Sequence, residues 1–332
     1  MSQNLSETAS ALVADGKGIL AADESSPTIK KRFDSIGVES TEENRRDYRT
    51  MLFSTPEAGS HISGVILFDE TIRQKSADGT PLVEVIRSGG MIPGIKVDKG
   101  AKPLAGFPGE KVTEGLDGLR ERCAEYVELG ARFTKWRAVY TIGEDGPSAA
   151  CLTANAHALA RYAAISQEAG LVPIVEPEVL MDGDHTIDDC ELVTEEALRT
   201  VFAELAVQEI ELEGMLLKPN MVLSGTDCPE QAGVEEVARR TVRTLKRTVP
   251  AAVPGIVFLS GGQSDEVATE HLNAINRLGE TQPWKLSFSY GRALQAAPLK
   301  AWAGSADNLV AAQQAFLERA KANGAATLGT NA

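Results

Sequence analysis

The chain has 332 residues, of which 43% are hydrophobic and 24% are charged, and this composition is ordinary for a soluble globular protein. It excludes collagen-like and largely disordered classes, and no apolar run approaches the length of about eighteen residues that a membrane span needs. The formal net charge of −14 at pH 7 repels nucleic acid and anionic membranes, so neither is expected as a partner.

Eight short apolar runs that end in polar, Gly or Pro residues predict β-strands. In chain order they are residues 16–25, 64–70, 94–98, 133–140, 172–178, 214–220, 255–262 and 284–291. Segments with helical periodicity lie between most of them, and several begin with Ser or Thr and an acidic first turn and end on Gly. These helices are predicted at residues 119–130, 153–170, 194–214, 234–249 and 264–279. Residues 41–49 also have helical spacing and suggest an exposed helix with ion pairs.

Strands that alternate with helices imply parallel pairing, because a parallel partner is reached only through a crossover. Eight repeats favour an α/β fold of the closed (β/α)₈ TIM-barrel type, and a doubly wound open sheet is the weaker alternative. No linker divides the chain, so residues 1–332 are expected to form one domain. The N-terminus (about residues 1–15) and the C-terminal tail (about residues 323–332) are expected to be loosely held.

Cysteine and histidine usage indicates the compartment and the cofactor class. The N-terminal residues MSQNLSETAS lack the basic and apolar segments of a secretory signal. The scattered cysteines suggest reduced thiols in the cytoplasm, and no His or Cys pair has metal-ligand spacing. The sequence therefore predicts no metal and no other cofactor. The residues concerned are Cys123, Cys151, Cys190, Cys228, His61, His157, His185 and His271.

The ends of the predicted strands carry polar side chains. Active sites of barrels gather at the C-terminal ends of their strands. Because strand side chains alternate between faces, each of the two strands at 133–140 and 172–178 offers a pair of charged residues on one face. One such residue alone is equally well explained by a structural ion pair, but together they predict a mixed cluster of acids and bases. The strand-end residues are Asp23, Asp69, Lys96, Lys135, Arg137, Glu176, Glu178, Lys218, Ser260, Ser289 and Arg292.

Lys218 ends the apolar run GMLLKPN at residues 214–220, where removing an ammonium from water is costly unless the group is paired or neutral. Burial near other cations would favour the neutral amine, which can attack a ketone and form an imine. An imine acts as an electron sink for cleavage of a carbon–carbon bond. Glu176, with a raised pKa, is predicted to protonate the departing hydroxyl, and Asp23 to take a proton from the hydroxyl that becomes an aldehyde.

Two loops predict a phosphate site. LSGGQS (259–264) places glycines between a strand and a helix N-terminus, which exposes backbone N–H groups to an anion, although a tight turn explains this stretch alone equally well. SYGR (289–292) follows the last strand, where barrels usually bind phosphate, and its arginine can grip phosphate with a planar fork. Lys96 is predicted to supply positive charge for a second phosphate.

Several longer motifs are spread from about residue 16 to residue 320. They are GKGILAADES, TEENRRDYR, GVILFDET, GIKVDKG, KWR, VPIVEPE, LLKPNMV, FLSGGQS and FSYGRALQA. This set closely resembles the class I, Schiff-base fructose-bisphosphate aldolases. The resemblance implies a (β/α)₈ barrel and reversible, metal-independent cleavage of fructose 1,6-bisphosphate to dihydroxyacetone phosphate and glyceraldehyde 3-phosphate, in glycolysis and gluconeogenesis.

The resemblance also implies roles for individual residues. Lys218 resembles the imine lysine, Glu176 resembles the main acid–base group, and Asp23 resembles the residue that handles the hydroxyl on carbon 4. Two further catalytic residues are implied to assist, namely Glu178 and Lys135. The implied substrate-binding residues are Arg137 in the channel, Ser260, Gly261, Ser289, Gly291 and Arg292 for the carbon-1 phosphate, and Ser25, Arg32 and Lys96 for the carbon-6 phosphate.

The chain departs from the family at its C-terminus. Animal members end in a flexible tail whose last residue, a tyrosine, visits the active site, whereas no tyrosine follows Tyr290 here. Another group or water is therefore expected to assist proton exchange on the enamine, and the preference between bisphosphate and monophosphate substrates stays open. Family members are commonly tetramers, so a homo-oligomer is expected.

Two other functions fit the same barrel. A phosphosugar isomerase would use Glu176 as a base and Lys218 as an electrophile that polarises the carbonyl without bonding to it. Reduction with borohydride separates this reaction from imine chemistry. A non-catalytic scaffold would keep the barrel alone, and the full set of charged strand ends argues against it.

Overall fold

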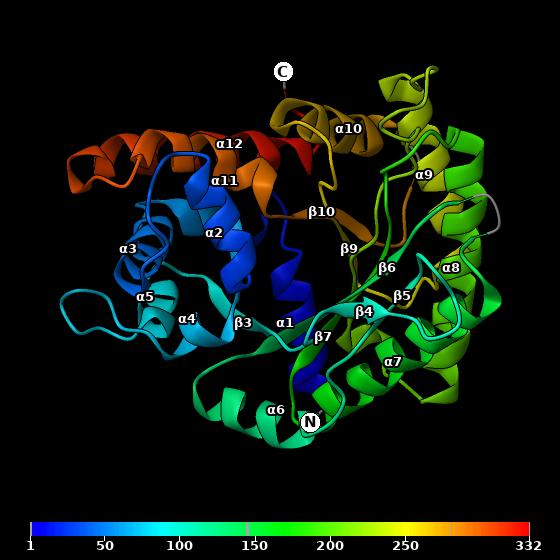
Figure 1. Cartoon of the computed structure of the whole chain (residues 1–332), viewed down its shortest axis with the longest axis horizontal. Coiled ribbons are helices and arrows are strands. Elements are labelled where there is room, and N and C mark those ends of the chain that lie inside the picture. The colour runs from blue at the N-terminus through cyan, green and yellow to red at the C-terminus, as the bar shows by residue number, and fades with distance from the viewer. Residues whose placement is uncertain (1, 144–145, 280, 332) are drawn as a thin grey trace.

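The eight predicted strands form one closed parallel barrel in a computed structural model, which describes residues 2–143, 146–279 and 281–331 (Figure 1). The order around the barrel is β1, β2, β3, β6, β7, β8, β9 and β10, and β10 pairs with β1. This closure confirms the (β/α)₈ fold. The strands are β1 (Gly18–Ala22), β2 (Ile62–Leu67), β3 (Ile92–Lys96), β6 (Phe133–Tyr140), β7 (Val172–Val179), β8 (Leu216–Leu217), β9 (Gly255–Phe258) and β10 (Lys285–Tyr290).

Helices surround the barrel (Figure 1), and a short antiparallel hairpin follows β3. The helices are α1 (Ser2–Leu12), α2 (Ser26–Asp34), α3 (Glu42–Phe53), α4 (Asp69–Arg73), α5 (Leu82–Ser88), α6 (Leu119–Glu128), α7 (Ala149–Glu168), α8 (Ile187–Val207), α9 (Val234–Thr248), α10 (Asp265–Arg277), α11 (Arg292–Trp302) and α12 (Leu309–Ala326). The hairpin pairs β4 (Ala101–Pro103) with β5 (Lys111–Thr113). The 3-10 turns are Ala58–Ser60, Leu212–Gly214 and Ala306–Asn308.

The helix predictions agree closely with α6, α9 and α10 and are displaced for α8. That helix begins after Thr186, whose side chain accepts from the Asp189 amide while the Asp189 carboxylate accepts from the Thr186 amide. This capping box fixes the start ahead of the predicted residue 194. The helix ends at Val207, before Glu209, which has φ 53°, so the predicted end at residue 214 is wrong.

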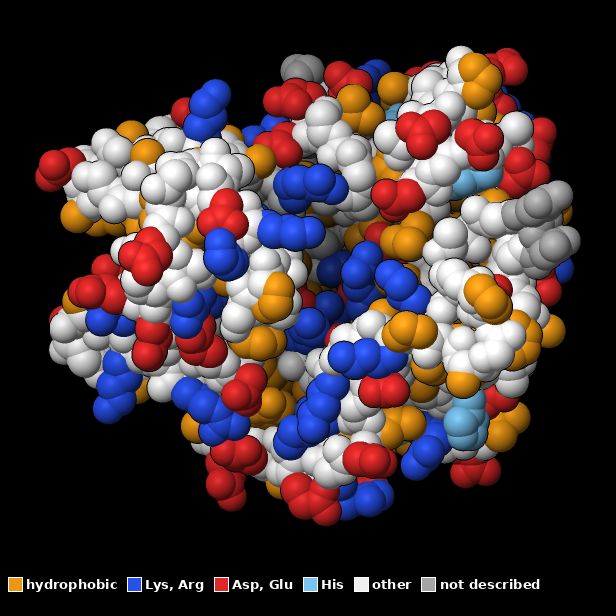
Figure 2. All heavy atoms as spheres, in the orientation of Figure 1, with side chains coloured by type: hydrophobic (Ala, Val, Ile, Leu, Met, Phe, Trp, Pro, Cys, Tyr) orange, Lys and Arg blue, Asp and Glu red, His pale blue; other side chains and the backbone are white. Residues whose placement is uncertain are grey.

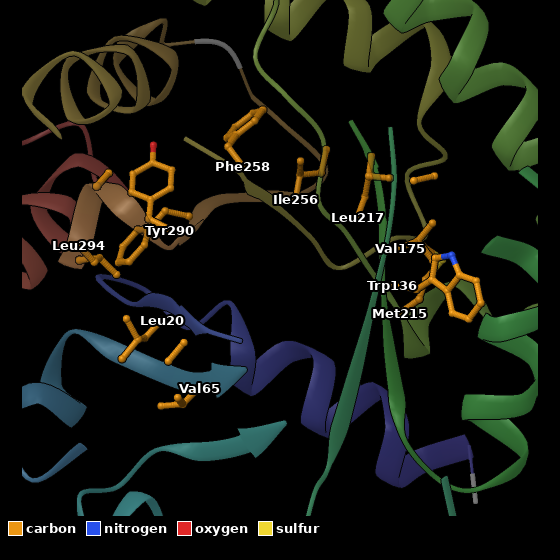
Figure 3. Close-up of a cluster of buried hydrophobic side chains, with 14 of the residues drawn as sticks. Leu20, Val65, Trp136, Val175, Met215, Leu217, Ile256, Phe258, Tyr290 and Leu294 are labelled. Atoms are coloured by element: carbon orange, nitrogen blue, oxygen red, sulfur yellow. The ribbon is translucent and has the colours of Figure 1, made fainter. Parts of the chain in front are cut away.

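Two hydrophobic layers follow from the alternation of strand side chains. Residues such as Ile19 and Ile174 point into the barrel, where they form one buried cluster. Their neighbours in sequence point outward and pack under the helices, as Leu20, Trp136 and Val175 do in Figure 3. The strands are thus buried on both faces, which explains why the sequence shows continuous apolar runs.

Helix α1 closes the N-terminal end of the barrel. Leu5 and Leu12 are 4% and 0% exposed and pack against the inward strand residues. A Cβ at Gly64 would lie 2.6 Å from Leu12, and one at Gly255 would lie 2.5 Å from Val13, so glycine leaves room for the helix. The sequence predicted a loosely held N-terminus, whereas the structure describes a helix whose residues Leu5, Ala9 and Leu12, followed by Val13, pack into the barrel end. Met1 lies outside the described residues.

The C-terminal segment is also attached to the barrel layer. Helix α12 packs on α11, and Asn323 within it is fully buried. Beyond the helix, the Asn273 side chain donates to the Asn331 carbonyl and accepts from the Asn331 amide, both at 3.0 Å. The predicted flexible tail therefore differs from the structure over residues 323–331, and Ala332 lies outside the described residues.

Candidate active site

A cavity of about 580 Å³ opens at the C-terminal ends of the strands. Figure 2 shows Lys and Arg side chains gathered in a hollow of this face, although the whole chain is acidic. All residues predicted for the site except Asp69 line the cavity. These residues are Asp23, Ser25, Arg32, Lys96, Lys135, Arg137, Glu176, Glu178, Lys218, Ser260, Gly261, Ser289, Gly291 and Arg292. Asp69, the other charged strand end, begins α4 and pairs with Arg73 instead.

The strands β6, β7 and β8 aim the central side chains. Arg137 lies opposite Glu176 in the register of β6 and β7, so the charged pairs of both strands point to the same side. The Lys218 amide donates to the Val175 carbonyl at 2.8 Å. This bond continues the pairing of β7 and β8 by one residue and turns the Lys218 side chain into the barrel. The proline at 219 then ends the strand, because it has no N–H to donate.

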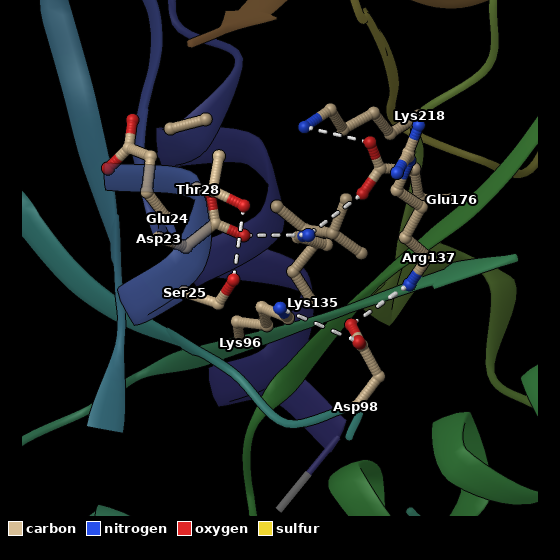
Figure 4. Close-up of polar contacts among 12 residues, drawn as sticks. Asp23, Glu24, Ser25, Thr28, Lys96, Asp98, Lys135, Arg137, Glu176 and Lys218 are labelled. Carbon is tan, nitrogen blue, oxygen red and sulfur yellow. Dashed lines mark hydrogen bonds and ion pairs between the residues drawn. The ribbon is translucent and has the colours of Figure 1, made fainter. Parts of the chain in front are cut away.

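Three buried charges and the partly buried Asp23 form a chain across the cavity floor (Figure 4). Lys218 Nζ lies 3.1 Å from Glu176 Oε1, and Lys135 Nζ lies 3.2 Å from Glu176 Oε2. Lys135 Nζ also lies 2.7 Å from Asp23 Oδ2. Lys218, Lys135 and Glu176 are only 3–4% exposed. Cations and carboxylates therefore alternate, and each charge is compensated by a neighbour of opposite sign.

These contacts shift the pKa values of the two carboxyl groups in the same direction. Burial favours the neutral acid, but Lys135 and Lys218 outweigh it and lower the pKa of both Asp23 and Glu176. The predicted raised pKa of Glu176 is therefore wrong, because the cations contact its carboxylate directly. Burial also acts to lower the pKa of Lys135, yet Asp23 and Glu176 raise it overall.

A second cluster lies at the rim above β3 and β6. Arg137 Nε donates to Glu178 Oε2, and the Arg137 amide donates to Asp98 Oδ2 at 3.3 Å. Lys96 Nζ lies 3.7 Å from Asp98 Oδ1. Asp98 lines the cavity but was not among the predicted site residues. The alternation rule could have found it, since it lies two residues after Lys96.

The loops after β9 and β10 lie side by side. Arg292 Nη2 donates to the Gly261 carbonyl at 2.5 Å, which joins the start of α11 to the glycine loop. Gly261 has φ +57°, a conformation that favours glycine. Ser289 is 1% exposed, and within the described residues its hydroxyl has no hydrogen-bond partner. Such a buried hydroxyl in the cavity wall suits a ligand oxygen.

The part of the rim that follows β1, next to the loop after β10, is organised by Glu24. Its carboxylate accepts from Arg32 and from Gln295 Nε2, the latter at 2.7 Å, and lies 3.7 Å from Arg49. Arg49 is 1% exposed, so the predicted exposed helix at 41–49 buries its last arginine. Ser25 Oγ lies 3.1 Å from Thr28 Oγ1 on the same rim. No simple sequence pattern identifies Glu24 or Arg49, because their contact joins two separate elements.

Comparison with known proteins shows the family of the chain. The family model for fructose-bisphosphate aldolase class-I matches residues 4–332. The chain belongs to this family. A relative from Xanthomonas campestris pv. campestris, named "Probable fructose-bisphosphate aldolase class 1", is 62% identical to this chain. The match covers 98% of each of the two chains. "Fructose-bisphosphate aldolase 4, cytosolic" from Arabidopsis thaliana is 59% identical over 95% of this chain and 80% of its own length.

A solved aldolase has the same fold. The chain superposes with a TM-score of 0.98 on fructose-bisphosphate aldolase from Plasmodium falciparum, solved in complex with TRAP and a small molecule inhibitor. The two sequences are 52% identical, and the match covers 100% of this chain and 96% of the other.

Membership in the aldolase family decides the reaction class. Class I fructose-bisphosphate aldolases are lyases that act on a sugar phosphate, so the isomerase alternative is not favoured. In residues 2–143, 146–279 and 281–331, no helix has the length and apolarity that a bilayer crossing requires.

Proposed function

We propose that this aldolase cleaves fructose 1,6-bisphosphate reversibly, without a metal, through an imine on Lys218. The observation that carries the proposal is the position of the Lys218 amine. It is buried at the floor of a basic cavity, 3.1 Å from a carboxylate that can take and return a proton. A lysine in this environment can act as a nucleophile toward a ketone.

Imine formation uses the contact between Lys218 and Glu176. Transfer of an ammonium proton to Glu176 frees the nitrogen lone pair, which attacks carbon 2 of the substrate. Glu176 then returns a proton to the carbinolamine hydroxyl, which leaves as water as the nitrogen forms the iminium. Lys135 holds the other oxygen of Glu176 and keeps the carboxylate oriented during both transfers.

Cleavage uses Asp23. Its lowered pKa keeps it ionised, so it can accept the proton of the hydroxyl on carbon 4. The bond between carbons 3 and 4 then breaks, its electron pair enters the iminium to give an enamine, and the aldehyde leaves. Protonation and hydrolysis of the enamine release dihydroxyacetone phosphate. Glu178 acts through Arg137, which lines the channel.

Each phosphate is assigned to its own set of cavity residues. We assign the carbon-1 phosphate to the loops after β9 and β10, where Arg292 and the buried Ser289 hydroxyl lie. Ser260, Gly261 and Gly291 belong to the same loops. We assign the carbon-6 phosphate to Ser25 and Arg32, in the segment after β1, and to Lys96 at the end of β3.

Two further assignments are proposals of the same kind. The cytosolic name of the Arabidopsis relative and the four free, buried cysteines support a cytoplasmic location. Family resemblance supports a homo-oligomer, with a tetramer as the form to test. Light scattering on the purified protein measures its mass in solution, and fluorescence of a tagged chain in cells reports its location.

Borohydride trapping tests the central proposal. With dihydroxyacetone phosphate and borohydride, the protein should gain the mass of the reduced adduct on the peptide that contains Lys218 and lose activity. Lys218→Met should keep its circular dichroism spectrum, gain no mass and show no turnover, while Lys285→Met, which removes an exposed lysine, should behave as the wild type. Turnover should also survive EDTA. An active wild type that gains no mass at Lys218 would rule out the imine.

A further inference from the structure

A sulfur contact attaches the loop after β9 to the loop after β7. The Gly262 amide donates to Met181 Sδ, with an N···S distance of 2.9 Å. A Cβ at Gly262 would lie 2.7 Å from that sulfur and 3.1 Å from Met181 Cγ, so the thioether lies directly against the glycine backbone. A thioether is a weak acceptor, yet here it satisfies an N–H of the loop that carries Ser260 and Gly261.

Met181 is itself held by the loop after β8. Its carbonyl accepts from the Thr226 amide at 2.7 Å and from Thr226 Oγ1 at 2.9 Å. The two loops are in close contact, because a Cβ at Gly225 would lie 2.3 Å from the Gly183 carbonyl oxygen. Met181 therefore connects three consecutive loops, which follow the strands that bear the acid–base glutamates, the imine lysine and the phosphate-binding serine.

We propose that Met181 is a positioning residue for the carbon-1 phosphate. Its sulfur fixes Gly262, and this fixes the two preceding residues, Ser260 and Gly261, which line the cavity. The Gly262 amide is turned toward Met181, so its hydrogen bond persists when phosphate binds. The inference rests on the proposed function, which assigns this loop to phosphate.

Two variants separate the acceptor from mere packing. Met181→Leu keeps an apolar side chain of similar volume but removes the acceptor, so inorganic phosphate should compete with substrate about two- to tenfold more weakly. KM for fructose 1,6-bisphosphate should rise in parallel, while kcat stays within about twofold because the loop acts on binding rather than on the reacting atoms. Met181→Gln offers an amide oxygen at similar reach and should restore much of the affinity.

A matched control uses another buried methionine. Met91 is 4% exposed and precedes β3 at the end of the barrel opposite the cavity, so Met91→Leu should leave the inhibition constant of phosphate unchanged. An unchanged constant in Met181→Leu would overturn the inference. Weaker phosphate binding by Met181→Gln than by Met181→Leu would also overturn it, because packing rather than the acceptor would then explain the loss.

Borohydride trapping keeps this test distinct from the imine proposal. The adduct mass on the Lys218 peptide measures formation of the covalent bond. Competition by inorganic phosphate measures phosphate binding at the loop. If the wild type forms the adduct but phosphate does not compete, the loop is not a phosphate site and the inference fails while the imine stands. If no adduct forms, the imine fails, and phosphate competition still decides the role of Met181.

Discussion

The contact between Glu176 and Lys218 makes a kinetic prediction at the scale of single residues. Glu176→Gln removes the group that moves protons in imine formation, so that step should slow by about a hundred- to ten-thousand-fold. Single-turnover mixing followed by borohydride quench measures it. Glu195→Gln, which alters a buried carboxylate paired with arginines outside the barrel, is the control. A slowing of less than about threefold would mean that Glu176 is not the acid–base group.

Asp23 makes a prediction about stability and pH. Its pKa in the folded protein lies below its value in the unfolded chain, so its ion pair with Lys135 contributes fully above about pH 4. The contribution is lost as pH falls further toward the folded pKa, because the unfolded chain then binds the proton first. Urea unfolding at a series of acidic pH values should therefore show a shallower pH dependence for Asp23→Asn than for the wild type.

The control for this experiment is an exposed pair. Asp15 and Lys285 are 2.7 Å apart but mostly exposed, so Asp15→Asn should follow the wild-type pH curve closely. Parallel curves for Asp23→Asn and the wild type would contradict the buried-pair argument.

Individual residues also show how much of the site could be predicted from the sequence. The alternation of strand side chains located the charges of β6 and β7, and applied to β3 it would have located Asp98 as well. It could not locate Arg49, whose contact with Glu24 depends on how α3 packs on the barrel. The direction of the Glu176 pKa was mispredicted because burial was weighed without the distances to its cations.

Helix α1 supplies a prediction at the scale of an element. Leu12 is fully buried at the end of the barrel, so Leu12→Ala should lower the free energy of unfolding by about 2–5 kcal/mol. Leu328→Ala, at a side chain that is 52% exposed, should change it by less than about 0.5 kcal/mol. Urea unfolding followed by circular dichroism compares the stability of the two variants. Equal losses would contradict the role of α1 in closing the N-terminal end of the barrel.

The elements that sequence reasoning misplaced share a physical cause. Leu5, Ala9 and Leu12 have helical spacing, but nothing in their own segment shows that a barrel end will cover them. The prediction for α8 began at the clearest periodicity and passed over the Thr186 capping box, which is a local signal. Strand positions were more accurate, because a strand buried on both faces leaves a continuous apolar run.

Charge distribution makes a prediction for the whole molecule. The chain carries −14, yet its cavity is basic, so an anionic substrate is repelled by most of the surface and attracted by one site. Raising ionic strength from about 10 mM to about 100 mM shortens the screening length about threefold, and kcat/KM for the bisphosphate should fall. Steady-state assays in potassium chloride measure this. Trapping with uncharged dihydroxyacetone is the control and should stay nearly constant; an equal fall there would contradict local attraction.

The topology of the whole molecule was predictable because eight repeats of strand and helix admit few arrangements of parallel strands. The closure at one end was not, since it depends on a segment outside the repeat. That closure determines how substrate enters the cavity and how products leave it. Because α1 fills the N-terminal end of the barrel, substrate and products would pass through the cavity mouth at the other end, and the proposed imine would hold one half of the substrate on Lys218 at the cavity floor. The aldehyde must then leave first and, in the reverse direction, bind last. The position of Lys218 in the cavity thus sets the order of substrate binding and product release.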